Sequence, residues 1–212
     1  MAAPTRSQAL SPPRVRWRPT LSNAGLAGLF ALFVVANGAS LLEQPRLSIG
    51  LLIVFQATIV GLAIVRRDAR SSDQSLAAFA AGWAGTVLPL FLRPTASGSD
   101  LLIGQSLQVA GLVLQLVAVL SLGRSFGVVA ADRGIKTGGA YRFVRHPIYA
   151  AYLLADIGFV VSHPTLGNVA AISAAAATQV IRIWFEERHL AGNPDYQEFC
   201  QARRWRLVPG VW

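Results

Sequence analysis

The sequence contains a single cysteine, Cys200, and only three histidines among its 212 residues. One thiol excludes an internal disulfide framework and any cysteine-based metal cluster. The histidines, His146, His163 and His189, also lack metal-ligand spacing, whereas a zinc site normally assembles three or four close ligands. We therefore expect no metal site.

Charged residues are scarce as well. They make up 14% of the chain, and the ten acidic residues are outnumbered by 19 basic ones, almost entirely arginine, for a net charge of +9. In a soluble protein this surplus would suggest nucleic acid. Here the arginines separate long apolar runs, and 53% of the residues are hydrophobic, which is too many for an ordinary soluble globule. We therefore expect an integral membrane protein whose partner is the lipid bilayer, with no nucleic acid.

Six apolar segments are present, and their continuous rather than alternating hydrophobicity indicates helices instead of barrel strands. A hydrocarbon core about 30 Å thick requires about 20 helical residues. All segments but the fifth, which has about 15 residues, reach or approach that length. We therefore predict an all-α, polytopic membrane bundle of about six transmembrane helices. The segments are Leu21–Leu42, Leu47–Val65, Gln74–Leu92, Leu101–Leu122, Pro147–Val161 and Leu166–Leu190.

Basic residues predict the orientation of this bundle. They concentrate before the first segment and after the second and fourth, whereas the other three loops offer only Arg46, Arg93 and His163. By the positive-inside rule, both termini and the long loop after the fourth segment face the cytoplasm. The proline-rich start of the chain, residues 1–20, is expected to be a disordered cytoplasmic tail.

The loop after the fourth segment is glycine-rich, about 20 residues long and too polar to lie in hydrocarbon. Loops of this length inside a compact domain are usually functional or disordered. The interleaved aromatics Phe126, Tyr141 and Phe143 argue against disorder. An arginine-rich linker lying on anionic lipid is the alternative interpretation.

Two motifs follow at the ends of apolar helices. The first runs Thr137-Gly-Gly-x-Tyr and then Arg145-His-Pro-x-Tyr; the second is Glu186-Glu-x-x-Leu, with Pro194-x-Tyr-x-x-Phe behind it. Together they resemble the isoprenylcysteine carboxyl methyltransferase family and its relatives, the integral-membrane phospholipid methyltransferases. The resemblance covers about the last 90 residues, Leu122 to Trp212. The first four segments match only as generic membrane helices.

The resemblance implies an S-adenosylmethionine-dependent methyltransferase with a lipophilic methyl acceptor. It divides the chain into the tail at residues 1–20, a four-helix membrane region at 21–122 and a methyltransferase core at 123–212. It also implies a cytoplasmic cofactor pocket formed by the loop after the fourth helix, the start of the fifth and the end of the sixth. By motif position, the cofactor contacts are Ile135, Lys136, Tyr141, His146, Pro147, Ile148, Tyr149 and Glu186. The residues expected to act on the acceptor are Arg182 and Glu187.

The residue types suit such a cofactor, which carries a sulfonium cation, an amino group, a carboxylate and an adenosine. Glu186 can bind the amino group or a ribose hydroxyl, and the rings of Tyr141 and Tyr149 can face a cation, which gains about 0.5–2 kcal/mol. Pro147 suits the first turn of a helix, where its missing N–H costs nothing. The free amides there are a natural seat for the carboxylate, with His146 as a neighbouring wall and donor.

Two polar positions have a competing structural interpretation. Arg182 and Glu186 are spaced as an ordinary helix ion pair, worth about 0.2–0.5 kcal/mol, but charges at a membrane helix end beside a cofactor loop favour function. Asp156 lies inside the fifth helix, where a hydrogen bond within the bundle is expected and a substrate role is open.

The expected reaction is methyl transfer to a carboxylate, which is already a nucleophile at neutral pH and needs no general base, so the protein mainly aligns the partners. A phospholipid amine or a thiol would need a base, for which His146, Glu187 or a tyrosine would have to serve. A non-catalytic membrane module and an NADPH-dependent membrane reductase are the alternatives from other classes.

Overall fold

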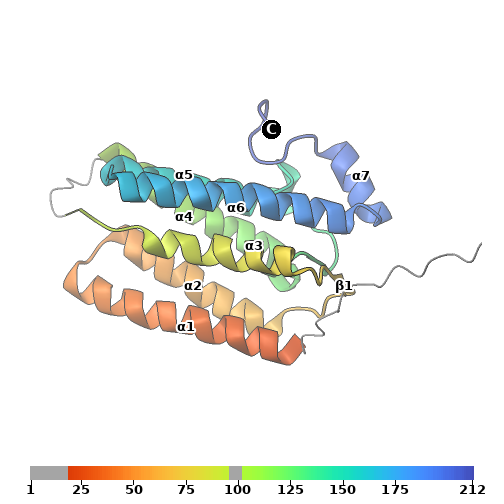
Figure 1. Cartoon of the computed structure of the whole chain (residues 1–212), viewed down its shortest axis with the longest axis horizontal. Helices are drawn as coiled ribbons and strands as arrows, with labels where there is room; N and C mark the ends of the chain where they lie inside the picture. The colour runs from red at the N-terminus through yellow and green to blue at the C-terminus, as the bar shows by residue number, and fades with distance from the viewer. Residues whose placement is uncertain (1–18, 96–101) are drawn as a thin grey trace, which may run out of the picture.

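The protein is described here by a computed structural model that covers residues 19–95 and 102–212, and Figure 1 shows its elements. Most of the described chain is helical. The α-helices are α1 (Pro19–Glu43), α2 (Leu47–Val65), α3 (Leu76–Val87), α4 (Leu102–Leu122), α5 (Pro147–Ser162), α6 (Leu166–Leu190) and α7 (Pro194–Ala202). Short 3-10 turns are η1 (Leu88–Phe91), η2 (Gly123–Ser125) and η3 (Gly139–Arg142), and the two strands are β1 (Ser71–Ser72) and β2 (Ala131–Asp132).

The six apolar segments correspond to α1 to α6, so the predicted helical segments are confirmed, whereas six membrane spans are not. Four of these helices, α1, α2, α4 and α6, are long and apolar enough to cross a membrane, whereas α3 and α5 are shorter. The predicted tail lies outside the described residues up to residue 18, as does Leu101 of the fourth segment, and Pro19 and Thr20 belong to α1 instead.

The third segment is shorter than predicted, and two residues explain its ends. Ser75 caps the start of α3, where its Oγ accepts the Ala78 N–H at 3.2 Å. Pro89 has no N–H to donate to the Gly85 carbonyl four residues earlier, so the α-helical ladder cannot continue past it. The chain turns into η1, and the Gly85 carbonyl instead lies 3.5 Å from the Gln179 side-chain amide of α6.

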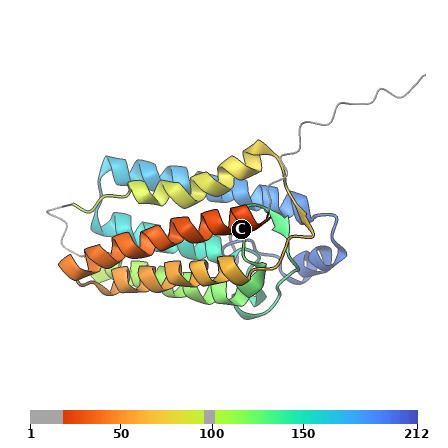
Figure 2. The same ribbon diagram turned by 90° about the horizontal axis from the view of Figure 1, so that it is seen from below.

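The helices run side by side along the long axis of the molecule, as Figures 1 and 2 show from two directions. α4 packs most extensively against α5, α1 packs against α2, and α3 packs against α6. The main hydrophobic core lies between α1, α2, α4 and α5, around buried side chains such as Phe55, Ile59 and Val119. The outer helix faces carry exposed apolar residues, as expected for contact with lipid.

Glycines allow α4 and α5 to approach closely. A Cβ at Gly158 of α5 would lie 2.3 Å from the backbone nitrogen of Gln108 and 2.6 Å from the Gly104 carbonyl. A Cβ at Gly111 of α4 would lie 2.4 Å from the backbone nitrogen of Ala155. Small residues at a helix crossing let the two backbones touch. This close packing helps helices to associate in lipid, where no hydrophobic force favours their association. This contact fixes the position of α5, whose first turn belongs to the site described below.

The loop after α4 is ordered by backbone hydrogen bonds to the connection between α2 and α3. Ser71 pairs with Asp132, and Ser72 with Ala131, in an antiparallel ladder. The Asp73 N–H donates to the Ala130 carbonyl at 2.9 Å. Phe126 and Tyr141 are buried, whereas Phe143 is 62% exposed. The loop is thus a folded part of the bundle end, as its aromatics predicted.

The helix contact is testable by substitution. We expect Gly158→Ala to lower the free energy of unfolding by about 1–3 kcal/mol, because the added methyl overpacks the α4–α5 interface. Gly61→Ala on α2 is the matched control, since a Cβ there meets nothing within 4 Å. Thermal unfolding in detergent measures both variants. Equal melting temperatures for the two would contradict close α4–α5 packing.

Candidate functional site

A cavity of about 650 Å³ lies inside the bundle, lined by residues of α1 to α6 and of the loop after α4. It extends from the bundle end where α5 begins and α6 ends, called the site end here, to the opposite, far end, where α1 meets α2. The site end is lined by Arg133, Ile135, Lys136, Tyr141, His146, Tyr149, Arg182 and Glu186. The far end is lined by Glu43, Arg46, Gln105, Ser162 and His163, among others.

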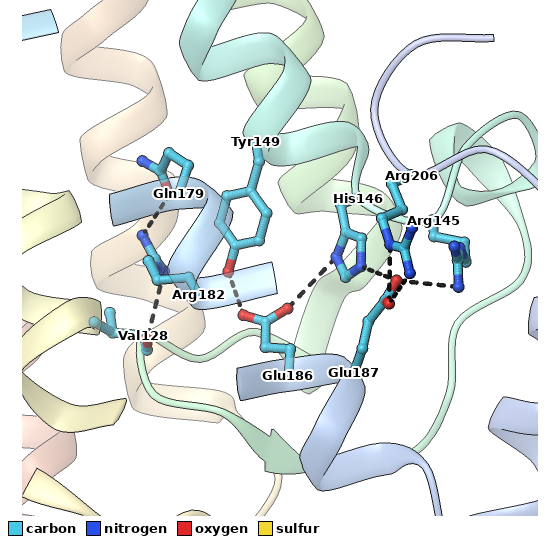
Figure 3. A network of polar contacts seen from close by, with 9 residues as sticks. All are labelled: Val128, Arg145, His146, Tyr149, Gln179, Arg182, Glu186, Glu187 and Arg206. Carbon is cyan, nitrogen blue, oxygen red and sulfur yellow. Dashed lines mark hydrogen bonds and ion pairs between the residues drawn. The ribbon is translucent and has the colours of Figure 1, made fainter. Parts of the chain in front are cut away.

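The start of α5 places His146 at the site end. Pro147 is the first helical residue, which confirms the predicted helix start, and His146 is the N-cap. The backbone N–H groups of Arg145 and His146 donate to the carbonyls of Trp205 and Arg206, each at 2.9 Å. The chain entering α5 is therefore held by the C-terminal segment, and the imidazole points toward the end of α6 (Figure 3).

Glu187 of α6 is bound by several basic groups. Its Oε1 lies 3.1 Å from Arg145 Nη1 and 3.2 Å from His146 Nε2. Its Oε2 accepts from both Nε and Nη2 of Arg206, at 2.9 and 2.8 Å. Both carboxylate oxygens are thus occupied by charge-assisted hydrogen bonds, which are roughly twice as strong as neutral ones. Glu187 is not among the cavity-lining residues, and neither is Pro147.

Glu186 has different partners and faces the cavity. The Tyr149 hydroxyl donates to its Oε1, and His146 Nδ1 lies 3.6 Å from its Oε2. The imidazole therefore lies between two carboxylates, one near each ring nitrogen, and it can donate to both only when both nitrogens are protonated. The Tyr149 ring stacks beside it, with centroids 5.8 Å apart. Figure 3 shows the row of side chains from Tyr149 to Glu187.

Arg182, one turn before Glu186, is buried and does not pair with it. Its Nη1 donates to Gln179 Oε1 at 3.2 Å, and its Nη2 donates to the Val128 carbonyl at 3.3 Å. The guanidinium carbon lies 4.8 Å from the centre of the Tyr149 ring. Tyr149 thus contacts both charged residues, and the helix ion pair considered from the sequence is not formed within the described residues. The Nε of Arg182 is buried without a hydrogen-bond partner in the described part of the chain.

The backbone conformation of the segment after β2 explains two of its glycines. Gly134 and Gly139 adopt φ angles of +91° and +59°, in the left-handed region that favours glycine. A Cβ at Gly139 would also lie 2.2 Å from Ser121 Oγ. That hydroxyl instead accepts the Ala140 N–H at 3.1 Å. These turns bring Ile135, Lys136 and Tyr141 to the cavity, and burial raises the pKa of Tyr141.

Arg133 was not among the residues predicted from the sequence. Its guanidinium lines the cavity and fits against Gly127, where a Cβ would lie 2.4 Å from Nη1. Burial lowers the pKa of Arg133 to about 10, and its Nε has no hydrogen-bond partner in the described ranges. A buried cation of this kind favours an anion beside it. The only sequence signal was its place two residues before Ile135.

The sequence predicted an interfacial C-terminal segment but not its contacts with the site. Residues 203–212 fold back against the entry to α5. Within this segment, the N–H groups of Arg206 and Leu207 both donate to the Trp212 carbonyl at 2.9 Å. The hydrogen bond to Glu187 raises the pKa of Arg206. Nothing in the sequence pairs Arg206 with Glu187, because the partners lie 19 positions apart on different elements. We call residues 203–212 the C-terminal strap.

The cavity therefore brings together most of the predicted site residues: Ile135, Lys136, Tyr141, His146, Ile148, Tyr149, Arg182 and Glu186. No group of three or more histidine, cysteine or acidic side chains in the described residues could hold a metal ion.

The hydrogen bonds between Glu187 and Arg206 should stabilise the C-terminal strap. We expect Glu187→Gln to weaken the hydrogen bonds from Arg206, because the neutral amide no longer offers a charged acceptor. Amide hydrogen exchange over residues 203–212 should then accelerate by about tenfold or more. Glu198→Gln on α7 is the control, since Glu198 is exposed and makes no contact in the site. Unchanged exchange in Glu187→Gln would show that the strap is held by other contacts.

Comparison with known proteins extends the sequence resemblance. The family model for phospholipid methyltransferases matches residues 99–193. The matched region includes the described helices α4, α5 and α6, so the match also covers α4, which the motifs alone resembled only as a generic membrane helix. It ends before α7 and the strap. A search of the curated proteins finds no match to the chain.

The matched residues contain the loop after α4, the start of α5 and the end of α6, which are the segments that meet at the cavity. Residues 99–193 of this chain therefore match the phospholipid methyltransferase family, a family of integral-membrane methyltransferases.

Proposed function

We propose that the protein is an S-adenosylmethionine-dependent membrane methyltransferase that methylates the carboxylate of an isoprenylcysteine-like or other lipophilic acceptor. The observation that carries this proposal is the arrangement around Tyr149. Its hydroxyl donates to the carboxylate of Glu186, and its ring lies against the guanidinium of Arg182. An acidic group and a basic group thus line one cavity on either side of an aromatic ring.

The site end fits the charges of the methyl donor. Glu186 offers a carboxylate for its amino group, and the rings of Tyr141 and Tyr149 offer faces for its sulfonium. For the donor's carboxylate, Arg133 offers a guanidinium on the cavity wall, and Lys136 lines the same cavity. The start of α5, proposed from the sequence as this seat, is a weaker candidate. The amides of Tyr149 and Ala150 already donate to the His146 carbonyl.

The donor supplies an electrophilic methyl group on sulfur. A lone pair of the acceptor oxygen forms the new O–C bond while the C–S bond breaks and its electron pair stays on sulfur. The residues of this chain align the two partners and exclude water, which is the main requirement for such a displacement. His146 is a positioning residue in this scheme, because its two ring nitrogens face the carboxylates of Glu186 and Glu187.

Arg182 is the proposed acceptor clamp. A planar guanidinium matches a carboxylate better than a point charge does, and the burial of Arg182 strengthens any interaction with an anion. We propose Glu187 as a second positioning residue, because its oxygens are bound by Arg145, His146 and Arg206 and it lies outside the cavity lining.

A second candidate, N-methylation of a phospholipid amine, is favoured by the name of the matching family. An ammonium acceptor must first lose a proton. Near the cavity, the Tyr149–Glu186 pair is the group that would have to take it, because His146 and Glu187 are engaged. We rank the carboxylate acceptor first because it needs no base. A thiol acceptor would face the same need for a base.

The orientation expected from the arginines fits a soluble donor. We propose that the site end faces the cytoplasm together with both termini, since Arg133, Lys136 and Arg145 lie there and basic residues favour that side. The acceptor would then enter from lipid and the donor from water.

The stability that each ligand adds to the protein distinguishes a methyltransferase from a reductase and from a non-catalytic module. With S-adenosylhomocysteine at about a hundred times its dissociation constant, we expect the purified protein to gain about 2.7 kcal/mol of stability, whereas NADPH should give no gain. Arg133→Ala and Glu186→Gln should each weaken this binding about tenfold or more, through loss of a charge-assisted contact. Arg142→Ala, an exposed arginine of η3, is the control. A gain with NADPH alone would favour a reductase, and a gain with neither ligand would favour a non-catalytic module.

Arg182 can be tested by separating donor binding from turnover. In labelled methyl transfer to a membrane lipid extract, we expect Arg182→Ala to reduce the rate about tenfold to a hundredfold, while its affinity for S-adenosylhomocysteine stays the same. Preserved affinity also shows that the variant folds. Arg188→Ala, exposed on the same helix, is the control. The label should be released by mild alkali as a methyl ester is; alkali-stable label on an amine would favour the second candidate.

A further inference from the structure

The cavity continues beyond the proposed methyl-transfer site along one face of α5. Tyr149, Tyr152, Asp156 and Phe159 all line it, and their spacing of three or four residues is that of one helix face. At 1.5 Å per residue, Asp156 lies about 10 Å from Tyr149 toward the far end. A carboxylate thus faces the same cavity, two helical turns deeper in the bundle than Tyr149.

A carboxylate at this depth has a high energetic cost. Translocon-based scales place it at about 2.5–3.5 kcal/mol near the centre of a membrane helix. Such groups normally face a partner, and Asp156 has neither a hydrogen bond nor an ion pair with any residue in the described part of the chain. The structural hydrogen bond expected from the sequence is not formed there. What Asp156 does face is the cavity.

An amide of the neighbouring helix lines the cavity at a similar depth. Gln108 of α4 is a lining residue, and its backbone packs against Gly158 of α5, which is only about 3 Å further along the helix axis than Asp156. The Gln108 side chain likewise makes no hydrogen bond within the described residues. By contrast, Asn37 and Gln56 of α1 and α2 also line the cavity but bind each other, with Nδ2 to Oε1 at 3.2 Å. That second pair is satisfied internally, whereas Asp156 and Gln108 are not.

We propose that Asp156 and Gln108 form a recognition site for a second polar group of the methyl acceptor. The group is a hydrogen-bond donor, such as a hydroxyl, an amide N–H or an amine, carried about 10 Å from the methylated atom on an otherwise apolar chain. This inference rests on the proposed methyltransferase function and narrows its substrate class, because a plain hydrocarbon acceptor would leave both side chains without partners.

The site at Asp156 and Gln108 would act mainly by discriminating between acceptors that carry the second polar group and acceptors that lack it. A pocket built to hydrogen-bond a substrate group rejects analogues that lack it, because its own polar atoms are then left unpaired. Tyr152, between Tyr149 and Asp156, and Leu112 of α4 provide ring and aliphatic surface along the cavity between the two polar sites. The acceptor chain would lie along this surface, with one polar group at Arg182 and the other at Asp156.

The test uses defined acids as probes: hexadecanoic acid, its 6-, 8- and 10-hydroxy derivatives, and 16-hydroxyhexadecanoic acid as a positional control. Binding is measured as the shift in melting temperature of protein saturated with S-adenosylhomocysteine, and turnover is measured as kcat/KM with labelled donor. We expect wild-type protein to prefer at least one internal hydroxy acid over hexadecanoic acid by about tenfold or more. Asp156→Leu and Gln108→Leu should reduce this preference, whereas Asp156→Asn should retain much of it.

Ser173→Leu on α6 is the matched control, because it removes an exposed hydroxyl and should leave the preference unchanged. Equal preference for all acids in wild-type protein, or an unchanged preference in Asp156→Leu, would overturn the inference. If no acid is methylated, the carboxylate proposal fails instead. The inference is then decided by mass spectrometry of the product that wild-type protein makes from a membrane lipid extract: a second polar group supports it, and a bare hydrocarbon chain or no product overturns it.

Discussion

Glu187 binds two separate parts of the chain: it pairs with Arg145 and His146 at the entry to α5, and it accepts two hydrogen bonds from Arg206 in the C-terminal strap. This one carboxylate joins the end of α6 to the start of α5 and closes the strap beneath both. Its position determines where His146 lies, and His146 in turn lies within reach of Glu186. The polar row along the cavity mouth therefore depends on an interaction just outside it.

The membrane environment strengthens the interactions between these charged groups. Charges in a region of low dielectric interact strongly, and unpaired ones are costly. Both oxygens of Glu187 are paired at the site end, whereas Glu186, Arg182 and Arg133 each line the cavity. Groups that are held in place by neighbours but still face a cavity are suited to a ligand that brings its own charges. Deeper in the bundle, Asp156 faces the same cavity without any such network.

Sequence reasoning recovered the parts of the fold that periodicity and local chemistry control. Long apolar runs predicted the six helices, and Pro147 predicted the start of α5, because both signals lie in consecutive residues. The end of α3 at Val87 was missed, since it depends on a proline within an apolar run and on a side chain from α6. The contacts of the strap were missed because they join distant segments of the chain.

The candidate site was predicted from the order of the motifs rather than from geometry. The motifs placed Tyr149 and Glu186 in one pocket, and the structure brings them into contact. They gave Glu187 a catalytic role, whereas its partners suit a positioning role, a distinction that only contacts could make. Arg133 and Gln108 carry no motif signal, because their significance lies in burial and in unpaired atoms that appear only once the chain is folded.

We propose that the site end binds the methyl donor through Glu186 and Arg133. An experimental structure of the protein with S-adenosylhomocysteine tests this most directly. We expect the amino group of the ligand to lie within hydrogen-bond distance of Glu186, and its carboxylate within hydrogen-bond distance of Arg133. A ligand bound outside the cavity, or in the cavity with its carboxylate directed away from Arg133, would contradict it.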